Sequence, residues 1–246
     1  MSRSGLLAGA SAAIAYAGPA LAPVLPGLAP ALGIQQRNRG PGVVLTFDDG
    51  PHPRGTPRIL ETLREAGAQA TFFLASEQVE RRPSLVAEIA AGGHGVALHC
   101  HRHRNQLRLT PGELRTDTAR ARALIEDAAG RAVDLYRPPY GIFSGVGLAV
   151  IRRAGLVPVL WSRWGRDWSA AATPGSVAGR CAGRLSDGDV LLLHDADHYS
   201  APGSWRVTAE ALPIILARVG EAGLEVAPLR AGRGGGVGSG AGGVGV

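Results

Sequence analysis

The amino-acid sequence predicts an α/β fold, a closed or nearly closed β/α barrel with about seven parallel strands. Short apolar runs alternate with helical segments through the middle of the chain. Each run is continuously apolar, which is typical of parallel strands that helices cover on both faces. Seven runs suit a barrel better than a sandwich, and an open doubly wound sheet is the alternative.

The expected strands and helices follow one another in regular order. The strands cover residues 43–47, 70–76, 94–99, 133–141, 156–162, 189–195 and 224–229. Helical periodicity fills most of the intervals, over residues 56–67, 83–93, 110–130, 145–154, 174–185 and 207–223. The helix over 110–130 has the clearest limits, because Thr110 suits its N-cap, Pro111 its first turn and Gly130 its C-terminal end.

Composition divides the chain into three parts. Residues 1–41 form a hydrophobic, signal-like segment and linker, residues 42–229 hold the expected strands and helices, and residues 230–246 are glycine-rich. A tail of that composition buries too little apolar surface to offset its ordering entropy, so we expect it to be disordered.

The N-terminal segment has features of a secretory signal. Residues 5–17 are moderately apolar and follow Arg3, and Ala15 to Ala17 fit a small-residue cleavage pattern. We therefore expect an extracytoplasmic protein, secreted or associated with the membrane or cell wall; an uncleaved anchor or a hydrophobic arm is the competing interpretation. Four prolines disfavour one spanning helix of about 20 residues: Pro19, Pro23, Pro26 and Pro30.

The charge of the chain comes from arginine alone. All 26 basic residues are arginine, against 20 acidic residues, and the net charge is +6. Together with 36 glycines and 17 prolines, the exclusive use of arginine indicates a general compositional bias more than selection for binding a polyanion. The arginines are scattered without aromatic interleaving, so no nucleic-acid partner is expected, whereas an anionic cell wall or membrane surface is a compatible neighbour. Cys100 and Cys181 permit one bridge but no disulfide framework, and we expect a monomer.

Polar clusters lie at or just beyond the carboxyl end of the apolar run in five of the expected strands. In a parallel barrel the carboxyl ends of the strands share one rim, so these clusters should converge on one site. They are Asp48 and Asp49; His99, His101 and His103; Arg137 to Tyr140; Asp167 and Trp168; and His194 and Asp195.

Two of the histidines have the spacing of metal ligands. His99 and His103 would share one face of a helical turn, and Asp49 would supply a third ligand. Three protein ligands leave a position open for water, as in a catalytic site. If the segment is extended, His99, His101 and His103 face the same way and form a rival set. Mixed nitrogen and oxygen ligation favours Zn²⁺, with Co²⁺, Ni²⁺ or Mn²⁺ as alternatives.

Five ordered motifs carry a resemblance to a known family. LTFDDGP, the H-x-x-x-H of HCHRH, RPPYG, RDW and LLLHD are similar to the motifs of polysaccharide deacetylases of the NodB-homology type, carbohydrate esterase family four. The resemblance spans residues 42–229. It implies a distorted β/α barrel and a divalent metal, and removal of N-acetyl or O-acetyl groups from a glycan such as peptidoglycan or a chitin-like chain.

The resemblance also implies roles for individual residues. Asp49, His99 and His103 would bind the metal, Asp48 would be the base on the water that the metal activates, and His194 would protonate the leaving amine.

The resemblance assigns supporting roles to the remaining motif residues. Arg137 would orient the base, Asp167 would pair with the catalytic histidine, and the backbone N–H of Tyr140 would stabilise the oxyanion. Trp168 and Leu191 would wall the pocket for the acetyl methyl group, and Asp195 is assigned no role.

The sequence departs from the family pattern at three positions. Cys100 stands where Ser or Thr is common, Leu98 where Asn is common, and Trp164 where another acid is common. His52 is expected to be an exposed loop histidine. The alternative functions are hydrolysis of a non-sugar amide on the same fold and carbohydrate binding by a relative that retains the cleft but has lost turnover.

Overall fold

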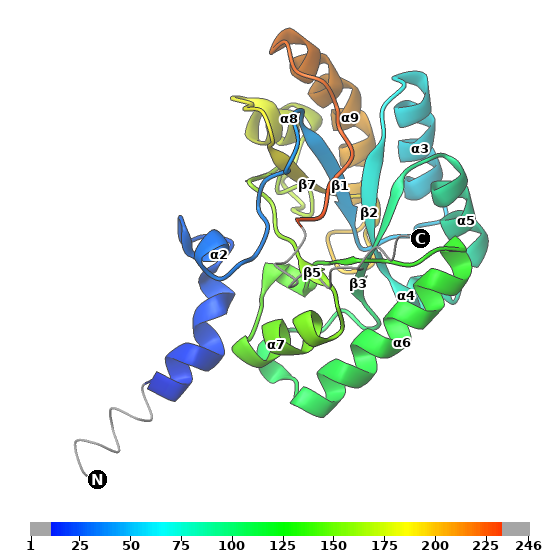
Figure 1. The fold of residues 1–246 in the computed structure, drawn as a ribbon. Coiled ribbons are helices and arrows are strands. Elements are labelled where there is room, and N and C mark those ends of the chain that lie inside the picture. The colour runs from blue at the N-terminus through cyan, green and yellow to red at the C-terminus, as the bar shows by residue number, and fades with distance from the viewer. Residues whose placement is uncertain (1–10, 233–246) are drawn as a thin grey trace, which may run out of the picture.

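A single parallel sheet of seven strands forms the centre of the computed structural model, which describes residues 11–232 (Figure 1). The strand order is β5-β4-β3-β2-β1-β7-β6, and every neighbouring pair is parallel. The sheet curls like a barrel, which confirms the predicted fold class. The strands are β1 (Val44–Asp48), β2 (Ala70–Ala75), β3 (Gly95–Cys100), β4 (Leu135–Tyr136), β5 (Val157–Pro158), β6 (Arg163–Trp164) and β7 (Val190–His194).

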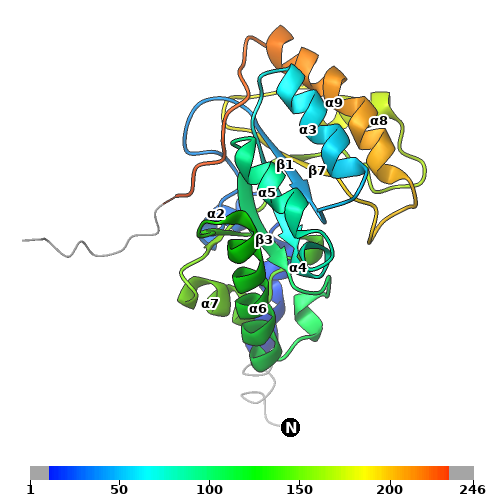
Figure 2. The same ribbon diagram turned by 90° about the vertical axis from the view of Figure 1, so that its right-hand side faces the viewer.

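Helices cover the outside of the curled sheet (Figures 1 and 2). The α-helices are α2 (Leu28–Ala31), α3 (Gly55–Glu65), α4 (Ser76–Val79), α5 (Pro83–Ala91), α6 (Pro111–Ala129), α7 (Gly145–Arg153), α8 (Pro174–Ala182) and α9 (Ser204–Glu221). Three short 3₁₀ helices are η1 (Gly18–Leu21), η2 (Gln106–Arg108) and η3 (Pro139–Gly141).

The central strands are buried on both faces, which explains their continuous apolar sequence. Every residue of β1 and β2 is buried. Phe47 and Phe72 stack across these two strands with ring centroids 5.1 Å apart. This layer of side chains between the sheet and the helices forms the main core.

The predicted limits of the helix over 110–130 are confirmed. Thr110 accepts a hydrogen bond from the backbone N–H of Glu113, whose side chain in turn accepts from the Thr110 backbone N–H. This capping box satisfies two donors that a helix start leaves unpaired. Gly130 ends α6 with a positive φ of 64°, a conformation that costs glycine little.

The seventh strand is not the one that the sequence predicted. Residues 224–229 form only one bridge, between Val226 and Val43, instead of a strand. The seventh place belongs to β6, a two-residue strand that pairs with β7. Two residues are too few to produce a recognisable apolar run.

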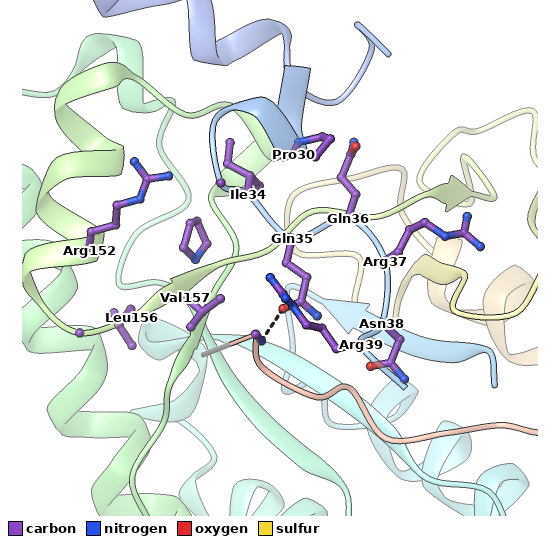
Figure 3. Close-up of a pocket in the computed structure, with 14 residues that line it drawn as sticks. Pro30, Ile34, Gln35, Gln36, Arg37, Asn38, Arg39, Arg152, Leu156 and Val157 are labelled. Atoms are coloured by element: carbon purple, nitrogen blue, oxygen red, sulfur yellow. Dashed lines mark hydrogen bonds between the residues drawn. The ribbon is translucent and has the colours of Figure 1, made fainter. Parts of the chain in front are cut away.

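A segment near the N-terminus spans the gap between the two sides of the curled sheet. Gln35 forms a parallel bridge with Val159, next to β5, and Arg37 forms an antiparallel bridge with Asp189, next to β7. Ile34 of the same segment is buried in the main core. Ile34, Gln35 and Arg37 line a cavity of about 960 Å³, and none of the predicted site residues lines it. Figure 3 shows this cavity.

The outermost described parts of the chain lie at the surface. Residues 11–17 are helical and project from the body in Figure 1, and the Tyr16 hydroxyl donates to the carbonyl of Leu107. Within residues 11–232, no helix has the length and apolar character needed to cross a bilayer. Of the glycine-rich tail expected to be disordered, residues 233–246 lie outside the described residues.

Candidate active site

The predicted polar clusters meet at the carboxyl ends of the strands. Asp48 ends β1 and lies beside His194, which ends the neighbouring strand β7. His99 belongs to β3, and Arg137 follows β4 directly. The parallel sheet therefore brings residues from distant parts of the chain to one rim, as the sequence predicted.

Asp49 faces two histidine rings. Its Oδ1 atom lies 3.3 Å from Nε2 of His99 and 3.4 Å from Nε2 of His103. Ligand atoms of the three side chains all lie within 4.8 Å of one another. Asp49 has a positive φ of 78°, so the chain turns sharply there, and its carboxylate faces the histidines while that of Asp48 faces Arg137.

The three side chains fit a divalent cation. Asp49 Oδ1 is buried and has no hydrogen-bond partner among residues 11–232. His99 Nδ1 lies 2.8 Å from the carbonyl oxygen of Arg137, which fixes the proton on Nδ1 and leaves Nε2 to face Asp49 with its lone pair.

Electrostatics also favour cation binding at this position. Burial alone would raise the pKa of Asp49, but the close imidazole of His99 and the nearby rings of His194 and His103 hold it well below its usual range. Burial lowers the pKa of His103 to about 4, against the attraction of Asp49. An ionised carboxylate beside a neutral imidazole is the protonation state that binds metal.

The predicted helical turn around these histidines is wrong. His99 lies in β3 and His103 in the irregular segment after it. His101 does not join the set, because its Nδ1 atom lies 2.9 Å from Ser76 Oγ and its backbone N–H donates to Asp117. These two contacts anchor the loop between the two candidate ligands.

Asp48 lies against a buried guanidinium. Arg137 Nη1 donates to Asp48 Oδ1 at 2.7 Å and to Thr46 Oγ1 at 2.8 Å. Arg137 Nη2 donates to the carbonyl of Leu160. Arg137 is completely buried, and at the rim it fixes and neutralises the Asp48 carboxylate.

His194 pairs with Asp167 on the other side of the site. Its Nδ1 atom lies 3.0 Å from Asp167 Oδ1, and Asp167 Oδ2 accepts from the His194 backbone N–H and from Thr208. Burial would lower the pKa of His194, but Asp167, together with Asp49 and Asp48, raises it to about 10. His194 is therefore held as an imidazolium near neutral pH.

A match between the sequence and a family model identifies the family. The family model described as polysaccharide deacetylase matches residues 35–159. The chain belongs to the polysaccharide deacetylase family.

Individual deacetylases are similar over most of the chain. A chitooligosaccharide deacetylase of Bradyrhizobium sp. is 34% identical over 197 residues, which cover 76% of this chain and 88% of the relative. A solved peptidoglycan N-acetylglucosamine deacetylase superimposes with a TM-score of 0.76 at 27% identity, covering 83% of this chain and 95% of that one. The family 4 carbohydrate esterase of Streptomyces lividans, solved with acetate, has a TM-score of 0.68 at 31% identity, covering 77% and 92%.

In the present protein, a cavity of about 290 Å³ opens at the rim formed by the carboxyl ends of the strands. Its walls carry Asp48, Asp49, His103 and His194 and, of the predicted substrate-binding residues, Tyr140 and Trp168. Three lining aromatic residues had no assigned place in the predicted site: Trp161, Trp164 and Tyr199. Trp161 follows β5, and that position at the carboxyl end of a strand was the available signal. Tyr199 lies in a loop where the sequence offers no comparable signal.

The predicted pocket residue Leu191 is wrong. Leu191 is fully buried in the core, and its neighbour Leu192 lines the cavity instead. Successive side chains of a strand point to opposite faces, so the error of one position moves the residue to the other face of β7.

The predicted exposed loop position of His52 is also wrong. His52 is buried, its Nδ1 atom accepts from the backbone N–H of Gly55, and its Nε2 atom lies 3.3 Å from Asp197. Asp195, which received no role, is buried below the turn at Gly50, and burial raises its pKa to about 7 although Thr56 donates to it.

The departures from the family pattern are buried or lie on the cavity wall. Trp164, in place of an acid, lies between Trp161 and Trp168, with ring centroids 5.6 and 5.8 Å away. It therefore extends an apolar wall and leaves Asp167 as the carboxylate paired with His194. Cys100 and Cys181 are buried and free, so the permitted bridge does not form.

Proposed function

We propose that this protein hydrolyses the N-acetyl groups of an N-acetylglucosamine-containing glycan, such as a chitin oligomer or peptidoglycan, with a divalent cation. One observation carries the proposal. The adjacent carboxylates of Asp48 and Asp49 have different partners, Arg137 and the two histidines, while His194 faces the same cavity. Such a site holds a base, a cation site and an acid as distinct groups within a few ångströms of one another.

Asp49, His99 and His103 would hold the cation, and mixed ligation by nitrogen and oxygen favours zinc. When bound, the cation would lower the pKa of water and polarise the acetyl carbonyl.

Asp48 would accept the proton of the attacking water. Its Oδ1 atom is fixed by Arg137, so the carboxylate keeps one orientation during the reaction. A positioned base of this kind accelerates hydrolysis by about 10²–10⁴-fold.

His194 would donate a proton to the departing amine nitrogen. Its Nε2 atom lies 4.0 Å from Asp49 Oδ2, on the side of the ring away from Asp167. Because its pKa is raised to about 10, the ring carries the proton before the reaction begins.

The remaining wall residues would hold the acetyl group and the sugar. Leu192 and Trp168 offer an apolar surface to the methyl group, and Tyr140 is 58% exposed at the mouth, where a sugar ring can stack. Tyr140 has a positive φ of 60°, and the peptide of this turn would offer its N–H to the developing oxyanion. The acetate in the Streptomyces lividans esterase supports an acetyl substrate for this fold.

Acetate release tests the proposal. The purified protein is incubated with N-acetylglucosamine oligomers and with peptidoglycan, with chelator, and with chelator followed by zinc. We expect release that chelation abolishes and zinc restores, and loss of release in Asp48→Asn with metal content retained. Glycan binding without any acetate release would instead support a binding protein, and cleavage of simple amides alone would support the non-sugar substrate.

A further inference from the structure

The two candidate histidine ligands are held in place by different means. His99 is oriented through a hydrogen bond from Nδ1 to the carbonyl of Arg137. Nδ1 of His103 is buried and has no hydrogen-bond partner among residues 11–232. Metal-binding histidines normally use this second nitrogen to fix the ring, so His103 requires another constraint.

Two tyrosine rings enclose His103. The ring of Tyr199 is stacked on it, with centroids 4.3 Å apart and an interplanar angle of 8°. The ring of Tyr140 contacts it edge-on, at 4.5 Å and 70°. A stacked neighbour restrains rotation about the last side-chain bond of His103, because turning the ring out of plane would drive it into Tyr199.

Tyr199 is itself held by α4, which in turn contacts the loop that carries His103. Its hydroxyl donates to Glu77 and accepts from Gln78 at 3.2 Å, both in α4. The backbone N–H of Glu77 donates to the carbonyl of His101, which lies between the two candidate ligands. The loop after β7 is therefore joined through Tyr199 to the loop that carries His103.

We infer that Tyr199 is a positioning residue for the metal ligand His103. Its flat ring fixes the orientation of the His103 imidazole, as a hydrogen bond fixes that of His99. The inference rests on the proposed metal-dependent function. The ring of Tyr199 holds the His103 imidazole plane so that Nε2 faces Asp49, and the contacts with Glu77 and Gln78 hold the ring.

Metal affinity tests this role apart from activity. Zn²⁺ affinity is measured by competition with a chromophoric chelator, and the visible spectrum of the Co²⁺-loaded protein reports coordination geometry. Wild-type protein must first bind one metal ion; failure at this step removes the proposed function, whereas the variants test Tyr199 only.

Three substitutions separate the ring from its hydroxyl. Tyr199→Phe keeps the stack and should change the dissociation constant less than about 3-fold, with an unaltered Co²⁺ spectrum. Tyr199→Leu keeps an apolar side chain without a flat ring, and Tyr199→Ala truncates the side chain to a methyl group; both should weaken binding by about 10-fold or more and alter the spectrum. Ser200→Ala, in the same loop but with its hydroxyl bound to Ser204, is the matched control and should bind as wild type does.

The inference is overturned if Tyr199→Leu binds metal as tightly as wild type with the same Co²⁺ spectrum. It is equally overturned if Tyr199→Phe is as weak as Tyr199→Leu, because the hydroxyl contacts rather than the stack would then position the ligand. Should Tyr199→Ala not fold, the comparison of Phe with Leu still decides the outcome.

Discussion

Arg137 and Asp48 form an ion pair in which neither side chain reaches bulk solvent. Their nearest atoms are 2.7 Å apart, and the side chains are 0% and 4% exposed. A buried charge that loses its partner is costly, whereas a neutral side chain in the same place is tolerated. This pair therefore links the stability of the protein to the orientation of the proposed base.

Arg137→Met should leave the Asp48 carboxylate buried and unpaired. We expect the free energy of unfolding to fall by about 3–5 kcal/mol, measured by urea denaturation. Adding Asp48→Asn to this variant should recover part of the loss because the uncompensated charge disappears. If the double variant is no more stable than Arg137→Met, the ion pair is not the source of the effect.

Asp167→Asn should move the basic limb of the pH–rate profile to lower pH. His194 acts as an acid and must be protonated, so activity is present below its pKa and is lost as the pH rises through it. Asp167 raises that pKa, so its neutral replacement should lower the limb by at least about one pH unit and reduce kcat/KM by about 10²–10⁴-fold.

The matched control for this variant is Asp189→Asn. Asp189 is a buried carboxylate immediately before β7, and it pairs with Arg37 away from the cavity. Its variant should leave the position of the basic limb unchanged. An equal shift in both variants would show that the overall negative charge of the protein, and not the contact of Asp167 with His194, sets the pH of the basic limb.

Metal binding should stabilise the folded protein in a way that depends on Asp49. At a free zinc concentration 100 times the dissociation constant, the stabilisation is about 2.7 kcal/mol, visible as a rise in Tm. Asp49→Asn should abolish this rise, and His94→Gln, at a buried histidine outside the site, should keep it. A zinc-dependent rise of equal size in Asp49→Asn would place the cation elsewhere.

Neighbouring leucines of β7 should have opposite phenotypes. Leu191→Ala creates a cavity in the core and should lower the free energy of unfolding by about 2–5 kcal/mol with KM unchanged. Leu192→Ala should instead widen the acetyl cavity and improve the relative kcat/KM for N-propionyl over N-acetyl substrates. Stability by denaturation and acyl-group competition assays measure the two effects, and the same specificity change in both variants would contradict the assignment.

The sequence predicted the rim because strand ends can be found locally. Apolar runs such as β1 and β7 end where Asp48 and His194 begin the polar clusters, and parallel topology then brings them together. The helix α6 was equally predictable, since its caps lie within its own sequence.

The errors share a dependence on contacts that are distant in sequence. The spacing of His99 and His103 fits a helix, but pairing of β3 with β2 holds His99 in a strand. His52 and Tyr199 gain their partners only in the folded chain, from Asp197 and from Glu77 respectively. Leu191 and Leu192 differ by one position of register, which an all-leucine run leaves undetermined.

The segment around Gln35 and Arg37 has a practical consequence for recombinant work. It occupies backbone groups beside β5 and β7 and contributes Ile34 to the core. A chain shortened to begin at residue 42 would leave the edge beside β5 unprotected and would present an uncovered apolar surface to other molecules. Such a truncated protein should self-associate during expression, even though every residue proposed for catalysis would still be present.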